Sequence, residues 1–119
     1  MSDYAPIVLF VYNRLNHTKQ TIEALKKNLK ADQSELYIYS DGAKDKDNFE
    51  KVTLVRNYIN NIDGFKNIKI IEREENFGLA KSIIDGVGKV LDLHEKIIVL
   101  EDDLVTSPYF LKFMNDALD

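Results

Sequence analysis

The sequence contains no cysteine, and only two prolines and five glycines among its 119 residues. Without cysteine, neither disulfides nor cysteine-ligated zinc can hold the fold together, so the protein needs no oxidising compartment. Internal repeats, low-complexity segments and Pro/Gly-rich linkers are also missing. A chain of this length is too short for two domains, so residues 1–119 are expected to form one domain around a single hydrophobic core.

Long runs of charged or apolar residues are equally scarce. The net charge is −4, and the lysines are scattered among acidic residues, which argues against a general affinity for nucleic acid. The amino terminus has no basic region, and the apolar run at residues 7–12 is too short to cross a membrane. We therefore expect a cytoplasmic protein with no integral membrane segment, in which residues 7–12 form a buried strand.

Apolar runs alternate with helical periodicity along the rest of the chain. Strands are predicted at residues 7–12, 36–39, 68–71 and 97–100, each followed by a segment with apolar residues at helical spacing. The first and last strands are apolar on both faces, as central parallel strands are. This pattern predicts an α/β fold, a three-layer α/β/α sandwich with a mostly parallel four-stranded sheet.

Local signals refine the expected helices. Asn16 or Thr18 is a candidate N-cap for the first helix, and Ser107-Pro108 has the pattern of an N-cap followed by the first helical residue. Gly86 and Gly88 lie inside the third helix, where glycine costs roughly 1 kcal/mol relative to alanine. Such small residues would let that helix approach the sheet closely.

The strongest functional signal is Glu101-Asp102-Asp103, which directly follows a fully apolar strand. In parallel α/β sheets, ligands bind beyond the carboxyl ends of the strands. Adjacent carboxylates there repel one another unless a cation intervenes, and a hard ion such as magnesium or manganese carrying a diphosphate would neutralise them. The alternative is a polar turn capped by one aspartate. The position at the end of a central strand favours the metal.

The other strand ends are individually ambiguous. In Ser40-Asp41-Gly42, the Asp-Gly pair is most often only a turn, but its carboxylate could also accept a hydrogen bond from the N–H of a base. Arg14 could pair with phosphate or be a solvated loop residue. Arg73 and the segment Asn76-Phe77-Gly78 either form a turn and cap, or face a diphosphate with the start of the next helix.

Taken together, these segments resemble the nucleotide-sugar-dependent glycosyltransferases of the GT-A fold over nearly the whole chain. Residues 5–14 resemble their opening strand and loop, and Ser40-Asp41-Gly42 resembles the segment that contacts the uracil base. Residues 76–80 resemble their Asn-x-Gly-Leu/Ile-Ala element. Residues 101–103 resemble the acidic metal motif, in the Glu-Asp-Asp form of the N-acetylglucosaminyltransferase-I-like branch. The chain as a whole resembles N-acetylglucosaminyltransferase-I-like or family-two-like enzymes. The chain would be the Rossmann-like, N-terminal nucleotide-binding half of that fold.

The resemblance implies a donor-binding role for four side chains: Arg14, Asp41, Arg73 and Asp102. Asp41 would contact the base, and Asp102 would lie near the ribose or a metal-bound water. Asp103, with Glu101, would hold manganese or magnesium. The implied reaction transfers a sugar from a nucleotide sugar, UDP-linked, to a carbohydrate or other hydroxyl acceptor. The family supplies its catalytic base from a region farther beyond the acidic motif, so no base is named and the chain is expected to stop before the acceptor-binding region.

Other functions are weighed against this one. A receiver-type signalling domain needs acidic residues after the first strand and a phosphorylatable aspartate after the third, where this chain has Asn13-Arg14 and Arg73-Glu74-Glu75. A nucleotidyltransferase needs a glycine-rich loop, but residues 13–21 contain no glycine. The main alternative is a non-catalytic module that binds a nucleotide sugar or assembles with a partner. Apolar surface on the third helix and near the chain's end would favour a homodimer.

Overall fold

The computed structural model describes residues 4–118, which form one four-stranded sheet and four α-helices. The elements in order are β1 (Ile7–Val11), α1 (Leu15–Lys26), the 3₁₀ turn η1 (Ala31–Gln33), β2 (Glu35–Ser40), α2 (Lys46–Ile59), β3 (Asn67–Glu72), α3 (Leu79–Leu91), β4 (Ile98–Glu101) and α4 (Phe110–Leu118). All strand pairs are parallel and the order is β3-β2-β1-β4. The predicted α/β sandwich is confirmed.

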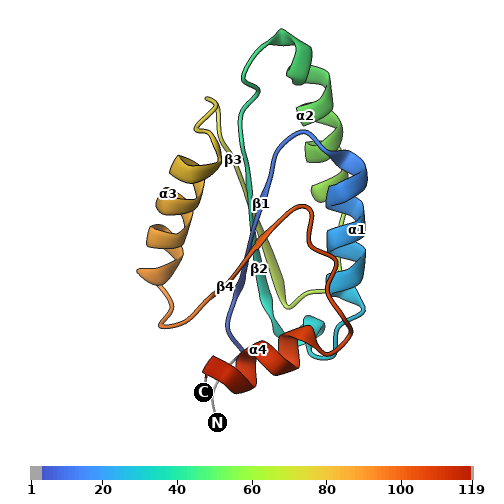
Figure 1. Ribbon diagram of the computed structural model, residues 1–119, viewed down its shortest axis with the longest axis vertical. Coiled ribbons are helices and arrows are strands. Elements are labelled where there is room, and N and C mark those ends of the chain that lie inside the picture. The colour runs from blue at the N-terminus through green and yellow to red at the C-terminus, as the bar shows by residue number, and fades with distance from the viewer. Residues whose placement is uncertain (1–3, 119) are drawn as a thin grey trace.

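The strand order determines which face each helix covers. The chain first moves outward from β1 to β2 and β3, so right-handed crossovers place α1 and α2 on the same face of the sheet. It then reverses direction to reach β4 on the other side of β1, which places α3 on the opposite face (Figure 1). The order 3-2-1-4 is that of a Rossmann-like half and differs from the 2-1-3 order of receiver-type domains. The topology therefore argues against a receiver domain.

The core is divided between the two faces of the sheet. The larger cluster joins Ile7 and Leu9 of β1 to Ile22 of α1, Val55 of α2 and Leu111 of α4. The smaller cluster packs α3 against the other face, and its buried members are Val8, Phe10, Tyr37, Tyr39 and Val90. Every residue of β1 is buried because helices cover both of its faces. This explains why its sequence is apolar throughout.

Helix α3 lies unusually close to the sheet at one glycine. A methyl group at Gly86 would lie 2.9 Å from Cε1 and Cζ of Phe10 and 3.1 Å from Cδ2 of Tyr39. No atom would lie within 4 Å of a methyl group at Gly88. The expected role of small residues in this helix therefore holds for Gly86 and not for Gly88.

The predicted helix starts are wrong at both ends of the chain. Arg14 is the N-cap of α1, and Thr18 lies inside the helix, where its hydroxyl donates to the Arg14 carbonyl at 2.8 Å. Helix α4 begins at Phe110, after a turn in which Phe110 N donates to Ser107 O. Leu29 N donates to Pro108 O, so Pro108 is tied to the end of the α1 segment and is not the first residue of α4. Within residues 4–118, no helix is both long and apolar enough to cross a bilayer.

Candidate functional site

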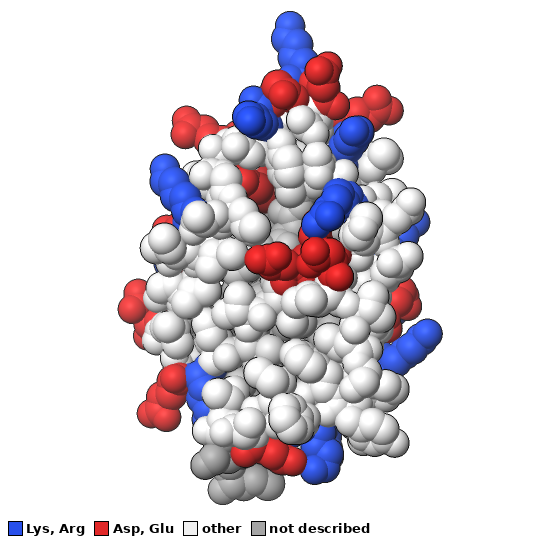
Figure 2. Space-filling model, viewed as in Figure 1, with Lys and Arg blue, Asp and Glu red and all other residues white. Residues whose placement is uncertain are grey.

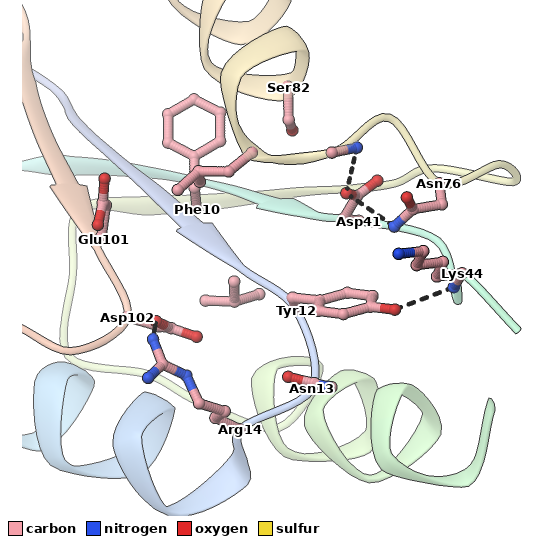
Figure 3. Close-up of a pocket in the computed structure, with 13 residues that line it drawn as sticks. Phe10, Tyr12, Asn13, Arg14, Asp41, Lys44, Asn76, Ser82, Glu101 and Asp102 are labelled. Carbon is pink, nitrogen blue, oxygen red and sulfur yellow. Dashed lines mark hydrogen bonds and ion pairs between the residues drawn. The ribbon is translucent and has the colours of Figure 1, made fainter. Parts of the chain in front are cut away.

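A pocket of about 370 Å³ opens at the carboxyl ends of β1, β2 and β4 (Figure 3). Its lining comes from residues 10–14, from Asp41 and Lys44 after β2, from Asn76, Gly78, Leu79 and Ser82 around the start of α3, and from Glu101 and Asp102. The strand order reverses between β1 and β4, and the crevice at such a reversal is where doubly wound sheets bind ligands. Figure 2 shows acidic side chains gathered near the middle of the visible face, with basic ones directly above them.

The acidic motif is anchored by helix α1. Arg14 Nη2 donates to Asp102 Oδ1 at 2.6 Å, and Thr21 Oγ1 donates to the Asp102 carbonyl at 2.8 Å. The Asp102 side chain is only 8% exposed, whereas that of Arg14 is 47% exposed. A nearly buried carboxylate needs a counter-charge, and Arg14 supplies it. The structure therefore brings together the strand ends of β1 and β4, as the sequence predicted.

Glu101 and Asp103 are less engaged than Asp102. Glu101 pairs in register with Phe10, a member of the cluster under α3, and it lines the pocket. Asp103 is exposed and does not line the pocket. Neither carboxylate has a hydrogen-bond or ion-pair partner within residues 4–118. Their oxygens are therefore free to contact a ligand.

The donor set limits how a metal could bind. Among the residues that the structure describes, no three His, Asp or Glu side chains are grouped so as to hold a metal ion. Asp102 is paired with Arg14, which leaves Glu101 and Asp103. Magnesium and manganese accept one or two carboxylates when phosphate oxygens and water complete the coordination. Glu101 in the pocket lining supplies a carboxylate of the kind that mode requires, Asp103 is exposed two residues later, and the metal itself stays a prediction.

Asp41 lies on the opposite side of the pocket, and its carboxylate is fully used by the protein. Oδ1 accepts from Gly42 N at 2.9 Å and Phe77 N at 2.8 Å, and Oδ2 accepts from Gly78 N at 3.0 Å and Asn76 Nδ2 at 3.2 Å. A carboxylate has about four acceptor positions. The side chain lines the pocket as predicted. Of its four donors, the exposed Asn76 amide also donates to Gly42 O at 2.8 Å and could give way to a base.

A half-buried arginine, Arg56, reinforces this side of the pocket. The Arg56 guanidinium donates to Ser40 Oγ at 2.9 Å and to the carbonyls of Ser40, Asp41 and Arg73 at 3.2, 3.1 and 2.8 Å. Arg73 N donates in turn to Ser40 O. The ends of β2 and β3 are therefore held together directly behind Asp41.

Arg73 does not line the pocket, so its predicted contact with the nucleotide gains no support from its position. The residue is 6% exposed and forms an ion pair with Asp85 at 2.9 Å. Its Nε donates to Ser82 Oγ, and the guanidinium lies over the Phe77 ring. Burial alone would raise the pKa of Asp85, but the hydrogen bonds and charges of Lys89 and Arg73 outweigh burial and lower that pKa. Arg73 thus joins α3 to the loop before it.

Lys44 and Ser82 are two of the pocket residues that were not predicted from the sequence. Lys44 lines the pocket opposite Arg14, and its backbone N–H donates to the Tyr12 hydroxyl at 2.9 Å (Figure 3). Ser82 is buried and accepts from Arg73 Nε, so its own proton remains free to donate. Both could have been found from spacing: Lys44 closely follows the Ser-Asp-Gly turn, and Ser82 lies one helical turn after Gly78.

Comparisons with known proteins bear on this fold and site. The model of the family described as Glycosyl transferase family 2 matches residues 7–119. Among solved structures, TarS of S. aureus is similar, with a TM-score of 0.66 and 17% sequence identity over 96% of this chain. At that identity the likeness establishes the fold alone, and the chain spans 19% of the TarS chain. A search of curated proteins gives no match.

Proposed function

The chain belongs to glycosyl transferase family 2, and we propose that its pocket binds the nucleotide-sugar donor of a glycosyl transfer reaction. The donor is UDP-linked, the acceptor is a hydroxyl group, and a divalent metal assists. The observation that most supports this proposal is that three separate motifs contribute to one pocket, through Arg14, through Asp41, and through Glu101 with Asp102. One bound nucleotide can therefore contact all of them.

The phosphates are proposed to lie between Arg14 and Lys44, the two cationic side chains that line the pocket. One Arg14 Nη is occupied by Asp102, and a guanidinium carries five N–H donors in all, so the others can reach a diphosphate. Lys44 provides a second positive charge. Asp102, already fixed by Arg14 and Thr21, is proposed to face the ribose.

Manganese or magnesium is proposed to bind beside Glu101 and Asp103, the two carboxylates of the motif that have no partner within residues 4–118. When bound, the metal would neutralise charge on the departing diphosphate. The protein's own part is to hold hard oxygen donors at the end of β4, with Glu101 in the pocket lining and Asp103 exposed two residues later. Asp103 is exposed, so the metal can be reached from solvent.

The alternative function is a non-catalytic module that binds a nucleotide sugar. Inverting transfer needs a carboxylate base to deprotonate the acceptor. Of the three carboxylates that line the pocket, Asp41 and Asp102 already accept hydrogen bonds from the protein. The third, Glu101, has no partner within residues 4–118 but is proposed to hold the metal. That leaves no pocket carboxylate for the base and favours a module that binds the donor without turnover.

Calorimetric titration with UDP, with and without manganese, tests the proposal. We expect manganese to strengthen binding, and Asp103→Ala to remove that metal-dependent part. Asp116→Ala is the matched control, because Asp116 is exposed on α4 and contacts only Lys112 among the described residues. Equal UDP affinity with and without manganese contradicts the metal role. A hydrolysis assay with UDP-sugars then separates an enzyme from a binding module.

A further inference from the structure

We infer that the hydroxyl of Ser82 donates a hydrogen bond to a carbonyl oxygen of the base and thereby helps the pocket to select uracil. This inference rests on the proposed function of the pocket and adds one residue to it. It starts from a buried polar group that lines the pocket and whose proton no residue within 4–118 accepts.

The Ser82 hydroxyl differs from the threonine hydroxyls on α1 and α2. Those of Thr18, Thr21 and Thr53 all donate to backbone carbonyls, at 2.8–2.9 Å. Ser82 is 3% exposed, and its oxygen accepts from Arg73 Nε at 3.1 Å. Its proton has no acceptor within residues 4–118, and a buried donor without an acceptor is unfavourable. A ligand in the pocket would supply the missing acceptor.

Arg73 determines which role the Ser82 hydroxyl can play. Besides the bond to Ser82 Oγ, the guanidinium donates to Ser82 O at 3.2 Å, and Asp85 holds it by an ion pair at 2.9 Å. A cation that donates to the hydroxyl oxygen polarises the O–H bond, so the proton becomes a stronger donor and the remaining lone pair a weaker acceptor. Arg73 therefore contributes to the pocket through Ser82, although it does not line the pocket itself.

Ser82 lies near Asp41, the candidate partner of the base. Gly78 connects the two residues, because its N–H donates to Asp41 Oδ2 at 3.0 Å and its carbonyl accepts from Ser82 N at 3.0 Å. In Figure 3 the Ser82 hydroxyl points from α3 toward the space between Phe10 and Asp41. This side of the pocket thus presents a hydroxyl donor together with a carboxylate acceptor.

This pair of groups matches the hydrogen-bonding edge of uracil. Uracil presents an N–H between two carbonyl oxygens. The N–H can donate to Asp41 once the exposed Asn76 amide gives way, and one carbonyl can accept from Ser82. Cytosine has an acceptor nitrogen in place of that N–H, so it would turn a lone pair toward the carboxylate and an amino group toward a hydroxyl polarised to donate. The pocket should therefore prefer UDP over CDP.

Thio-substituted nucleotides test the inference first in the wild-type protein. Sulfur is a weak hydrogen-bond acceptor, so replacing the carbonyl oxygen that Ser82 contacts should weaken binding by about five- to tenfold. We expect this loss for either 2-thio-UDP or 4-thio-UDP relative to UDP in calorimetric titration. Equal affinity for all three nucleotides overturns the inference.

Ser82→Ala then assigns that loss to the hydroxyl. The affinity for UDP should fall by about five- to tenfold, the affinity for CDP should change little, and the weaker thio analogue should bind the variant as well as UDP does. A hydroxyl with a purely structural role would instead lower all affinities by a similar factor. Thr53→Val, which removes a hydroxyl on α2 outside the pocket, is the matched control and should keep the wild-type ratios.

The outcomes separate this inference from the proposed function. Affinity ratios are compared within each variant, so a partial loss of folding in Ser82→Ala, which lowers all affinities alike, cancels. Wild-type ratios that persist in Ser82→Ala overturn the role of Ser82. Failure of the wild-type protein to bind UDP overturns the proposed function instead.

Discussion

The pocket is bounded by two walls that each present carboxylates to the same space. We call Asp41 and residues 76–78 the clamp wall, and Arg14, Glu101 and Asp102 the acidic wall (Figure 3). On the clamp wall, one carboxylate accepts four hydrogen bonds from the protein. On the acidic wall, the Asp102 side chain forms one ion pair, with Arg14. Glu101 has no hydrogen-bond or ion-pair partner within residues 4–118.

This difference distinguishes carboxylates that stabilise the fold from carboxylates that are free to bind a ligand. A carboxylate that accepts hydrogen bonds from several backbone amides contributes to the fold, and removing it leaves those amides without their acceptor. A carboxylate with free oxygens costs the fold little when it is removed, and it can receive a ligand. Presence in a pocket alone therefore does not identify a ligand-binding residue.

The largest effect is expected from removing the central carboxylate of the clamp wall. Asp41→Ala should lower the free energy of unfolding by about 2–4 kcal/mol, because three backbone N–H groups lose their acceptor. Glu101→Ala should change it by no more than about 0.5 kcal/mol. Urea denaturation of both variants measures the contrast. Equal losses in the two variants would abolish the distinction between the walls.

The next largest effect concerns how closely α3 approaches the sheet, since α3 begins at the clamp wall. Gly86→Ala should destabilise the protein by about 1–3 kcal/mol, because the new methyl group would meet the rings of Phe10 and Tyr39. Gly88→Ala is the matched control in the same helix. It meets nothing and should stabilise the protein by about 0.5–1 kcal/mol. Thermal unfolding of the pair checks both signs.

A smaller effect is expected on the acidic wall. Thr21→Val removes the hydroxyl that donates to the Asp102 carbonyl while keeping the shape of the side chain. The loss should be about 1 kcal/mol, because one buried acceptor loses its donor. Thr53→Val on α2 serves as the control, since its hydroxyl is exposed and donates within its own helix. A Thr21 variant as stable as the Thr53 variant would show that α1 does not anchor the motif.

The smallest effect is a change in pH dependence at the ion pair behind the clamp wall. The lowered pKa of Asp85 means that its charged form is favoured in the folded state. The stabilisation is therefore present above the ordinary pKa of an aspartate, about 3.9, and is lost as the pH falls through the folded value. Asp85→Asn should lower Tm at pH 7. At a pH below the folded pKa of Asp85, the variant and the wild-type protein should have the same Tm. A Tm difference that is independent of pH contradicts this assignment.

The sheet and the pocket's position could be predicted from the sequence because burial on both faces leaves a plain signature. Residues 7–11 are apolar throughout for that reason, and the ends of parallel strands must share one edge. The fate of individual polar side chains could not be predicted in this way. Arg73 after β3 suits a ligand and a structural ion pair equally well, and its actual partner, Asp85, belongs to the following helix.

The role of Asp41 illustrates the same limit. An Asp-Gly pair indicates a turn, and the resemblance indicates a base contact. Neither suggests that Asp41 accepts hydrogen bonds from the backbone amides of the loop that follows β3. That arrangement depends on how closely Gly42 approaches Glu75, which is a property of the assembled sheet. Lys44 was overlooked because no apolar pattern marks the segment that carries it into the pocket.

The register of β4 against β1 has a consequence for variants of this chain that differ in length. Phe10 stands opposite Glu101, so Glu101 falls on the side of α3, and Asp102, one residue later, turns to Arg14 on the side of α1. Neighbouring residues of a strand project to opposite faces. Deleting Val99 would keep the sequence Glu-Asp-Asp intact. It would nevertheless shift the register by one residue, so that each acidic side chain projects from the opposite face of the sheet. A sequence alignment would then show an intact motif although the side chains no longer lie in the positions that form the site.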